Sequence, residues 1–538
     1  MRRQWLVPAA VLLMLSWMAT AMVVTAIQQS PINDEPVYVA AAVAYDQRGS
    51  LQVNPEHPPL TKILIAVGLQ GADVHLDPAY KIGLKLNDQW TLGRTVLYES
   101  GNDTDRMLLW ARLPSIVLTL LFGLVVFFFA RDLFGDGGGL LALALFTLSP
   151  DLIAHGSVAA NDVPVAGFIL TTAWLLWRAR NRPKLYLPLA GAAFGCALAS
   201  KMSALSLFPV VLVLAGWSMW YASSAPTRRR LLHAAGAVAL VGAIAVAVVW
   251  ITYLVVDPSL NVVVEPRFRP SSRLKRLVLK LMPFPKPYTD GLSIQLKFEG
   301  NEYKSYLFGE ISDTARWYYL PVALAVKEPL GMLGAWLVGL AAFAVHRMLR
   351  PMVPYVLLMP AVLLGVAMTG SRDLGVRYVV WLPMFMAVAA GAVVVFRRRR
   401  VAIGAMVALV AFTAFSTVRA FPYYLPYSNE AFGGPSQTYR YLGDSNVDWG
   451  QDMRRLGQYL GRTAPGEPVW LMYYGPAVPG YYGVNARNLK DVPVSDVHGL
   501  VAVSVHLLAT RKDQYTALLA DAEPITTIGH TIKVYRLP

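Results

Sequence analysis

Charged residues are scarce in this chain of 538 residues: they make up 15% of it, whereas 55% is hydrophobic. The mean hydropathy of +0.44 excludes an ordinary soluble enzyme. Cysteine is nearly absent, because Cys196 is the only one and lies inside an apolar run. A single cysteine excludes an intrachain disulfide and gives no information about the redox compartment. Internal repeats and low-complexity tracts are also lacking.

Acidic residues are fewer than basic ones, 33 against 48, and the formal net charge is +15. A strongly basic chain can bind nucleic acid. Here many basic residues sit in short loops between apolar runs, so we expect no nucleic-acid partner. Several of those runs reach the roughly 20 residues that a helix needs to cross a bilayer. The composition therefore predicts an α-helical, polytopic membrane protein.

The basic loops predict the topology. The first apolar run, at about 5–27, follows Met1-Arg2-Arg3. A cleaved signal peptide is the alternative, but its apolar core is usually only ~7–15 residues long, so we expect an uncleaved first helix. Short loops rich in Lys and Arg stay inside. If the chain starts in the cytoplasm and crosses the membrane about eleven times, four basic clusters lie on the cytoplasmic side: 178–184, 222–230, 346–351 and 397–400.

The same count places two long loops, 28–112 and 257–318, on the outer face. We therefore expect a membrane domain over residues 1–420, followed by an extracytoplasmic domain over 421–538. Within the second loop, 273–281 is a basic amphipathic stretch suited to the membrane surface.

The C-terminal section has a soluble composition. Residues 469–473 and 500–505 have strand patterns, and 453–460 has a helical one. A small α/β domain is the prediction. Within this C-terminal section, 442–452 is dense in polar groups. Asp448 and Gln451 have the spacing of a capping box there, with an acceptor or ion contact as the alternative.

Ionisable residues gather at the outer ends of the spans, although they come from distant parts of the sequence. Carboxylates can act as general bases toward a hydroxyl, and Lys and Arg suit a phosphate. Such a set fits a transfer whose leaving group is a lipid-linked phosphate, because cations stabilise the charge that builds on it. The residues are Asp34, Glu35, His57, Lys62, Asp162, Lys201, Arg372 and Arg377.

Each of these residues also has a structural interpretation. Asp34 and Asp162 precede helical patterns and suit helix caps. Lys62 and Lys201 could extend to the membrane surface along their apolar stems, and His57 could be an ordinary loop histidine. No secure metal site is predicted, because histidines and acids lack a convincing partner set. A divalent cation is left open as a cofactor.

A series of motifs makes the chain resemble the GT-C glycosyltransferases, in particular the bacterial branch similar to dolichyl-phosphate-mannose protein mannosyltransferases and the aminoarabinose lipid A transferase. The resemblance covers roughly residues 1–455, in the same order. The motifs are Asp34-Glu35, His57-Pro58-Pro59-Leu60-Thr61-Lys62, His155-Gly156-Ser157, Asn161-Asp162, Ser200-Lys201, Arg377-Tyr378 with Pro383, Phe421-Pro422-Tyr423-Tyr424, and Asp444-Ser445-Asn446 to Asp452.

The resemblance implies a polyprenyl-phosphate sugar donor, an inverting transfer, and catalysis on the outer face of the inner (plasma) membrane. It implies that Asp34 is the base and that Glu35 helps to position the acceptor. The other implied site residues are Lys201, Arg377, Lys62 and Arg372 at the donor phosphate, and His57, Asp162 and Tyr378 in the cavity or beside the acceptor.

One departure from the family concerns the acceptor. Eukaryotic protein mannosyltransferases carry a β-trefoil domain in an outer loop, and the loop 257–318 is too short for one. This departure weakens protein as the acceptor, and the acceptor hydroxyl stays open between a lipid, a glycan and a protein. The main alternative function is a transporter or flippase of a lipid-linked anionic substrate, which would hold its polar site near mid-membrane on broken helices. An envelope scaffold and an enzyme using a diphosphate carrier are further alternatives.

Overall fold

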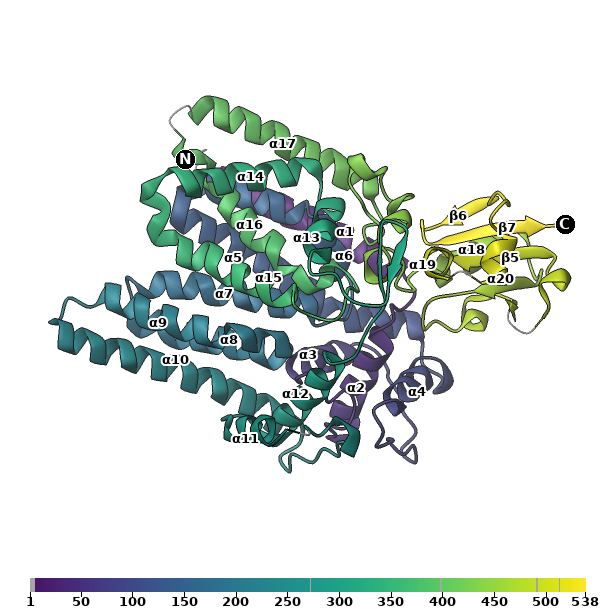
Figure 1. The fold of residues 1–538 in the computed structure, drawn as a ribbon, viewed down its shortest axis with the longest axis horizontal. Helices are drawn as coiled ribbons and strands as arrows, with labels where there is room; N and C mark the ends of the chain where they lie inside the picture. Colours follow the sequence, from purple (N-terminus) through teal and green to yellow (C-terminus); the bar gives the residue numbers. More distant parts are fainter. Residues whose placement is uncertain (1–4, 271, 397–398, 490–491, 512) are drawn as a thin grey trace.

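A body of long helices with a small sheet domain at one end makes up the computed structural model (Figure 1). The body helices run roughly alongside one another. Arg2 and Arg3 of the expected basic start, and Arg397 and Arg398 of the last basic cluster, are not among the described residues. Those are 5–270, 272–396, 399–489, 492–511 and 513–538.

The apolar runs of the sequence form helices, and the polar stretches between them add shorter ones. They are α1 (Leu6–Gln28), α2 (Glu35–Arg48), α3 (Leu60–Leu69), α4 (Asp88–Arg94), α5 (Thr104–Thr147), α6 (Pro150–Gly156), α7 (Asp162–Ala179), α8 (Pro183–Ser200), α9 (Phe208–Ala222), α10 (Thr227–Val256), α11 (Arg273–Leu281), α12 (Lys286–Phe298), α13 (Tyr319–Lys327), α14 (Leu330–Val345), α15 (Met359–Ala367), α16 (Trp381–Ala390) and α17 (Arg399–Ala420).

Five of the described helices are long and apolar enough to cross a membrane, or six if the bent pair α13 and α14 is one span. The 44-residue helix α5 contains a break at Gly135, whose φ of 75° and ψ of −177° are not helical. This break separates the two apolar runs expected there. The predicted number of about eleven spans is not confirmed by these lengths and stays a prediction.

Small residues let neighbouring helices approach closely. Helix α8 packs against both α7 and α10 and carries Gly191 and Gly195 about one turn apart. A Cβ atom on Gly195 would lie 2.6 Å from Val248 Cβ and 2.9 Å from the Ala245 carbonyl oxygen of α10. In a bilayer, such close packing holds helices together, because lipid offers no hydrophobic drive for association.

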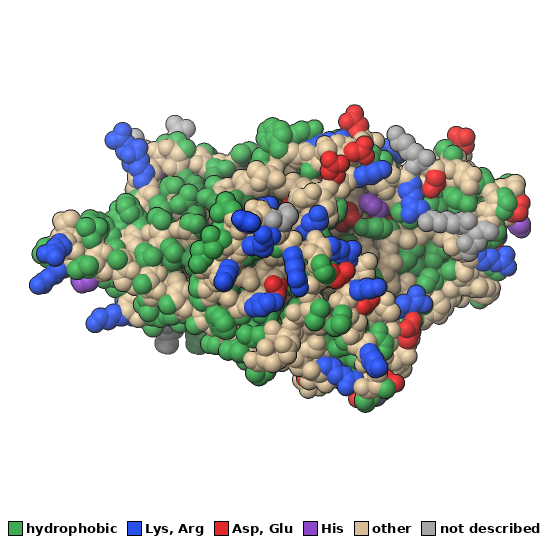
Figure 2. All heavy atoms as spheres, turned by 60° about the horizontal axis from the view of Figure 1, so that its bottom comes forward, with side chains coloured by type: hydrophobic (Ala, Val, Ile, Leu, Met, Phe, Trp, Pro, Cys, Tyr) green, Lys and Arg blue, Asp and Glu red, His purple; other side chains and the backbone are tan. Residues whose placement is uncertain are grey.

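Two loop regions fold over one end of the body. The first holds α2, α3 and α4; the second holds α11, α12 and the hairpin of β1 (Ser305–Leu307) and β2 (Glu310–Ser312). Trp250 Nε1 near the end of α10 donates to the Pro283 carbonyl oxygen at 2.9 Å, which ties α11 to the bundle. Basic side chains gather on this face (Figure 2). The apolar stripe of α11 is exposed, as expected for a helix on the membrane surface: Leu274, Leu277, Val278 and Leu281.

The described part of the C-terminal domain is a mixed five-stranded sheet with flanking helices. The strand order is β4-β3-β5-β7-β6, with β3 parallel to β4 and β5 and with β7 antiparallel to β5 and β6. The expected small α/β domain is therefore confirmed, while its boundary at residue 420 stays a prediction. Its elements are α18 (Met453–Thr463), β3 (Val469–Met472), β4 (Ala486–Asn488), β5 (Gly499–Ser504), α19 (Val505–Thr510), α20 (Gln514–Leu518), β6 (Thr526–Ile528) and β7 (Ile532–Leu537).

Candidate functional site

Asp34 and Arg377 lie far apart in the sequence and are in contact in the structure. Arg377 Nη1 donates to Asp34 Oδ2 at 2.5 Å, and the two side chains are 12% and 26% exposed. Asp34 directly precedes α2, but its side chain makes no capping hydrogen bond to that helix. The capping interpretation of Asp34 therefore does not hold, and part of its carboxylate faces solvent.

A second pair of opposite charges joins Lys201 to Asp162. Lys201 Nζ lies 2.5 Å from Asp162 Oδ1, and the side chains are 14% and 2% exposed. Lys201 follows the last residue of α8 with an extended backbone, whereas Asp162 begins α7. Asn161, not Asp162, occupies the capping position of α7. Lys201 thus points into the protein and does not extend to the membrane surface.

The ring of Tyr378 links the two pairs. Lys201 Nζ lies 5.1 Å and Arg377 Cζ 5.2 Å from its centre, within the roughly 6 Å at which an aromatic ring attracts a cation. The two acids and two bases balance in charge. Five of the residues proposed from the sequence are thus brought together, in the order Asp34, Arg377, Tyr378, Lys201 and Asp162.

Glu35 has a different place from its neighbour Asp34. Its side chain is fully buried, and both of its oxygens bind the equally buried guanidinium of Arg112, at 2.7 and 2.6 Å. The backbone amides of Ile32 and Ala159 donate to the same carboxylate at 3.0 and 2.9 Å. Glu35 has no oxygen left for an acceptor, so its implied role in acceptor positioning is replaced by one in fixing the loop before α2.

Arg112 is a residue to which the sequence reasoning gave no role. It lies on α5, and its guanidinium also donates to the carbonyl oxygens of Ala26, Gln29 and Ser30, at 2.6 to 3.1 Å. These bonds hold the end of α1 and the chain that leads to Asp34. The available signal in the sequence was an arginine at the start of an apolar run. Arginines are almost never fully buried unless they are paired.

Lys62 lies on α3 and is buried beneath the loop that precedes this helix. Its Nζ donates to the carbonyl oxygens of Asn54 and His57, each at 2.7 Å. Burial lowers the pKa of the Lys62 ammonium to about 7, and the nearby Glu56 carboxyl opposes this shift. Lys62 as a whole residue is only 1% exposed. Lys62 therefore holds the loop together and does not extend to the membrane surface, while its role at the donor phosphate stays a prediction.

His57 and Arg372 border the five-residue set. Burial lowers the pKa of His57 well below its usual value, and the positive charges of Lys201, Lys62 and Arg372 lower it further. His57 is therefore neutral at pH 7. Arg372 forms an ion pair with Glu299, the residue that follows α12, and donates to Gln295 Oε1 of α12 at 2.9 Å. Its guanidinium is thereby held by α12, at the edge of the site.

The polar segment 442–452 contributes an aromatic ring that the sequence reasoning did not assign to the site. Arg377 Cζ lies 4.5 Å from the centre of the Trp449 ring. The His155 ring meets the same indole edge-on at 6.1 Å, and burial lowers its pKa to about 3. The expected capping box is wrong: α18 begins at Met453, and Gln451 Oε1 accepts from the Trp449 amide at 2.8 Å.

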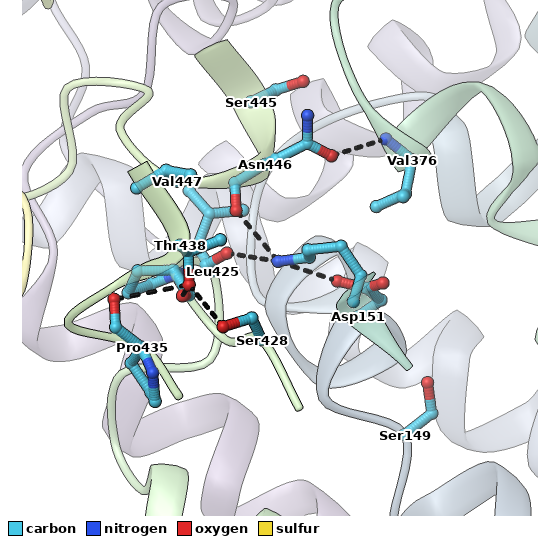
Figure 3. A network of polar contacts seen from close by, with 12 residues as sticks. Ser149, Asp151, Val376, Leu425, Ser428, Pro435, Thr438, Ser445, Asn446 and Val447 are labelled. Atoms are coloured by element: carbon cyan, nitrogen blue, oxygen red, sulfur yellow. Dashed lines mark hydrogen bonds and ion pairs between the residues drawn. The ribbon is translucent and has the colours of Figure 1, made fainter. Parts of the chain in front are cut away.

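Lys327 is the centre of a buried network beside the site. It ends α13, at the 119° bend that separates α13 from α14. Its Nζ donates to the carbonyl oxygens of Leu425 and Asn446 at 2.6 and 2.9 Å and lies 3.2 Å from Asp151 Oδ1 (Figure 3). Lys327 was assigned no role from the sequence. The network joins the bend to α6 and to the segment that leads into the C-terminal domain.

The acids and histidines do not assemble as metal ligands within the described ranges. No group of three or more His, Cys, Asp or Glu side chains there could hold a metal ion. Glu56 accepts from Gln89 Nε2 at 3.0 Å, and burial raises the pKa of its carboxyl. A divalent cation as a cofactor stays a prediction.

One solved structure has a similar fold over nearly the whole length of this chain. The chain is similar to ArnT from Cupriavidus metallidurans bound to undecaprenyl phosphate, with 14% identity, 98% of this chain and 97% of that chain covered, and a TM-score of 0.51. Weaker likeness extends to the S. cerevisiae protein O-mannosyltransferase Pmt1-Pmt2 complex bound to the sugar donor (18% identity, 56% and 39% covered, TM-score 0.36). It also extends to the Archaeoglobus fulgidus oligosaccharyltransferase in complex with Zn and sulfate (12% identity, 83% and 55% covered, TM-score 0.44).

The sequence itself matches a protein family over one part of the chain. The family described as dolichyl-phosphate-mannose-protein mannosyltransferase matches residues 106–253, from α5 to α10. Curated protein sequences gave no match. The expected resemblance to the GT-C superfamily of glycosyltransferases is confirmed, and the chain has the fold of that superfamily.

Proposed function

We propose that this chain is an integral-membrane, inverting glycosyltransferase. It moves a hexosyl or pentosyl group from a polyprenyl-phosphate donor to a hydroxyl of a lipid, glycan or protein. The observation that carries the proposal is the contact of Asp34 with Arg377, next to the Lys201–Asp162 pair, with both cations near the Tyr378 ring. A candidate base and two candidate phosphate-binding cations are thus gathered around one aromatic ring.

In the proposed reaction, the acceptor oxygen attacks the anomeric carbon and its proton passes to Asp34. The bond from that carbon to the phosphate oxygen breaks on the opposite face, which inverts the configuration. The polyprenyl phosphate leaves with one more negative charge. Lys201 and Arg377 stabilise this charge, in the way that cations lower the barrier of other phosphate-releasing reactions. Asp162 holds Lys201 in place when no donor is present.

The donor class is supported by the likeness to ArnT, which has been solved with undecaprenyl phosphate bound. The site is proposed to face the outside of the inner (plasma) membrane. In support, the Asn33 amide donates to the Trp449 carbonyl oxygen at 2.9 Å. The first outer loop and the approach to the C-terminal domain therefore share one face, as the basic inner loops require.

Transfer by purified protein tests the proposal. Wild type, Asp34→Asn and Asp46→Asn would be supplied with polyprenyl-phosphate sugars and a membrane extract as acceptor, and the labelled products counted. Asp46 is the matched control, because it is an exposed acid on the same helix α2. Loss of a general base costs about 10²–10⁴ in rate, so only Asp34→Asn should lose transfer. Equal transfer by all three proteins would refute the assignment of Asp34.

A transporter of a lipid-linked anion is the second candidate, because one observation favours it. The bend of 119° between α13 and α14 places the buried Lys327 and Glu328 at a broken helix, and transporters often build their sites at such breaks. Movement of a fluorescent polyprenyl-phosphate sugar across liposomes, without transfer to any acceptor, would favour this function over the first.

A further inference from the structure

One short segment contacts both the stretch just before Asp34 and the stretch just before Arg377. We propose that residues 444–451, here called the brace, are the positioning element that sets Arg377 against Asp34. The catalytic consequence of the brace rests on the proposed function, whereas its contacts can be tested without any activity. The brace lies just before α18 and the strands of the C-terminal sheet, so it also connects that sheet to the site.

The brace holds the chain before Arg377 through two fully buried side chains. Asn446 Oδ1 accepts a hydrogen bond from the Val376 amide at 3.0 Å, one residue before the arginine. Ser445 Oγ donates to the Leu374 carbonyl oxygen at 2.5 Å. Since both bonds go to the backbone, they fix the path of the chain that carries the guanidinium.

Glycine is required where these two stretches meet. Gly375 lies between the two bonded residues, with a φ of 147°. A Cβ atom there would collide with Ser445 Oγ and would lie 3.3 Å from Asn446 Oδ1. The brace and the 374–377 segment are therefore in direct contact, with no room for a side chain between them.

The same brace holds the chain before Asp34 through backbone groups. The Asn33 amide donates to the Trp449 carbonyl oxygen at 2.9 Å, and the Ser30 amide donates to the Gln451 carbonyl oxygen at 3.0 Å. The bonds to the segment before Arg377 and to the segment before Asp34 all come from eight consecutive residues. A distortion of the brace would therefore move the acid and the cation relative to each other.

The Trp449 ring adds a third contact, to the guanidinium itself. The residue is 2% exposed, and Arg377 Cζ lies 4.5 Å from the centre of its ring. Stacking on a buried ring restricts the plane of the guanidinium, while Nη1 stays in contact with Asp34. The brace thus fixes the arginine by backbone path, by ring stacking and by the position of its acid partner.

Hydrogen–deuterium exchange on the full-length protein tests the brace directly. Asn446→Ala removes the acceptor of the Val376 amide, so exchange at that amide should quicken at least tenfold. Asn429→Ala is the matched control. Asn429 is equally buried, and its side chain bonds Ala325, Glu328 and Ala431. It should leave the Val376 amide protected. Ser445→Ala is the milder variant, used if Asn446→Ala does not fold.

Transfer kinetics test the positioning role. A misplacement of about 1 Å can cost around 10² in rate, so Asn446→Ala should lower kcat by about 10- to 100-fold with little change in acceptor KM. Trp449→Phe keeps an aromatic face beside Arg377 and should retain at least tenfold more transfer than Trp449→Leu. Asn429→Ala should transfer like wild type.

The outcomes separate the brace from the proposed function. Unchanged exchange at Val376 in both Asn446→Ala and Ser445→Ala overturns the brace, whatever the activity. Faster exchange with a wild-type kcat overturns its positioning role, as does equal transfer by Trp449→Phe and Trp449→Leu. If the wild type shows no transfer, the proposed function fails, while faster exchange at Val376 still supports the brace.

Discussion

Arg377 reaches Asp34 across 343 positions of sequence, with Nη1 and Oδ2 2.5 Å apart. The arginine belongs to the short turn Val376–Val379, and the acid precedes α2. An arginine presents several donors in a rigid fork, so it can bind one anion while it contacts another. We infer that the donor phosphate shares this guanidinium with Asp34.

Replacing Arg377 tests that shared role. Arg377→Ala should lower kcat/KM for the donor by about 100-fold or more, because it removes a charge-stabilising donor of the kind worth 10²–10³ in rate. Arg377→Lys keeps the charge but loses the fork, so it should fall between alanine and wild type. Steady-state transfer rates at several donor concentrations provide the measurement. A lysine variant as impaired as alanine would show that charge alone contributes little.

Glu35→Gln should affect stability more than chemistry. Breaking a buried ion pair by removing one partner costs about 3–5 kcal/mol, and here it would leave the Arg112 guanidinium buried without its counter-charge. Unfolding of the purified protein in detergent measures the loss. Glu99→Gln is the control, because the Arg94–Glu99 pair is exposed and such pairs contribute about 0–1 kcal/mol. Equal destabilisation of both variants would contradict the structural role of Glu35.

Lys62 predicts a pH dependence of stability. Its pKa is about 7 in the folded protein and about 10.4 in an unfolded chain. Between these values the unfolded chain binds a proton that the folded chain has released, so stability increases with pH. Wild type should therefore gain stability relative to Lys62→Met as the pH rises from about 7 to 10.

Unfolding midpoints at pH 7, 8 and 9 give this measurement. Lys81→Met is the control, because Lys81 is exposed in the same outer loop. Its difference from wild type should stay constant with pH. A constant difference for Lys62→Met as well would show that the folded pKa of Lys62 is not lowered.

The exposed stripe of α11 should contact lipid. A spin label at Leu277→Cys, in a Cys196→Ser background, should collide more often with oxygen, which concentrates in the bilayer, than with a water-soluble nickel complex. A label at Lys275→Cys, exposed and on the side of the helix opposite Leu277, should show the opposite preference. Equal preference at both positions would mean that α11 does not lie along the membrane surface as expected.

The sequence predicted the membrane class and the residues of the central set, for physical reasons. Lys201, Asp162 and Arg377 each stand at the end of an apolar run, and the basic inner loops place those ends on one face. Ionisable groups at such positions are costly unless they are paired or functional. Topology therefore predicted that these residues share one face, and the folded structure then showed which of them pair.

The sequence could not assign the roles of adjacent residues. Successive residues near a helix start point about 100° apart, so Asp34 faces the site while Glu35 faces Arg112, and no pattern distinguishes them beforehand. The burial of Lys62 depends on where the Asn54 and His57 carbonyl groups point, which only the folded loop fixes. Trp449 lies in a segment whose polar residues suggested a cap, and its ring contact spans distant parts of the chain.

The most direct measurement of the central claim combines donor binding with one round of transfer. Wild type and Asp34→Asn would be loaded with a labelled polyprenyl-phosphate sugar, and the bound donor and the single-turnover rate measured on the same sample. If Asp34 is the base, donor binding stays within a few-fold of wild type while the rate falls by about 10²–10⁴. A single-turnover rate equal to that of wild type, with the donor bound, would contradict the account.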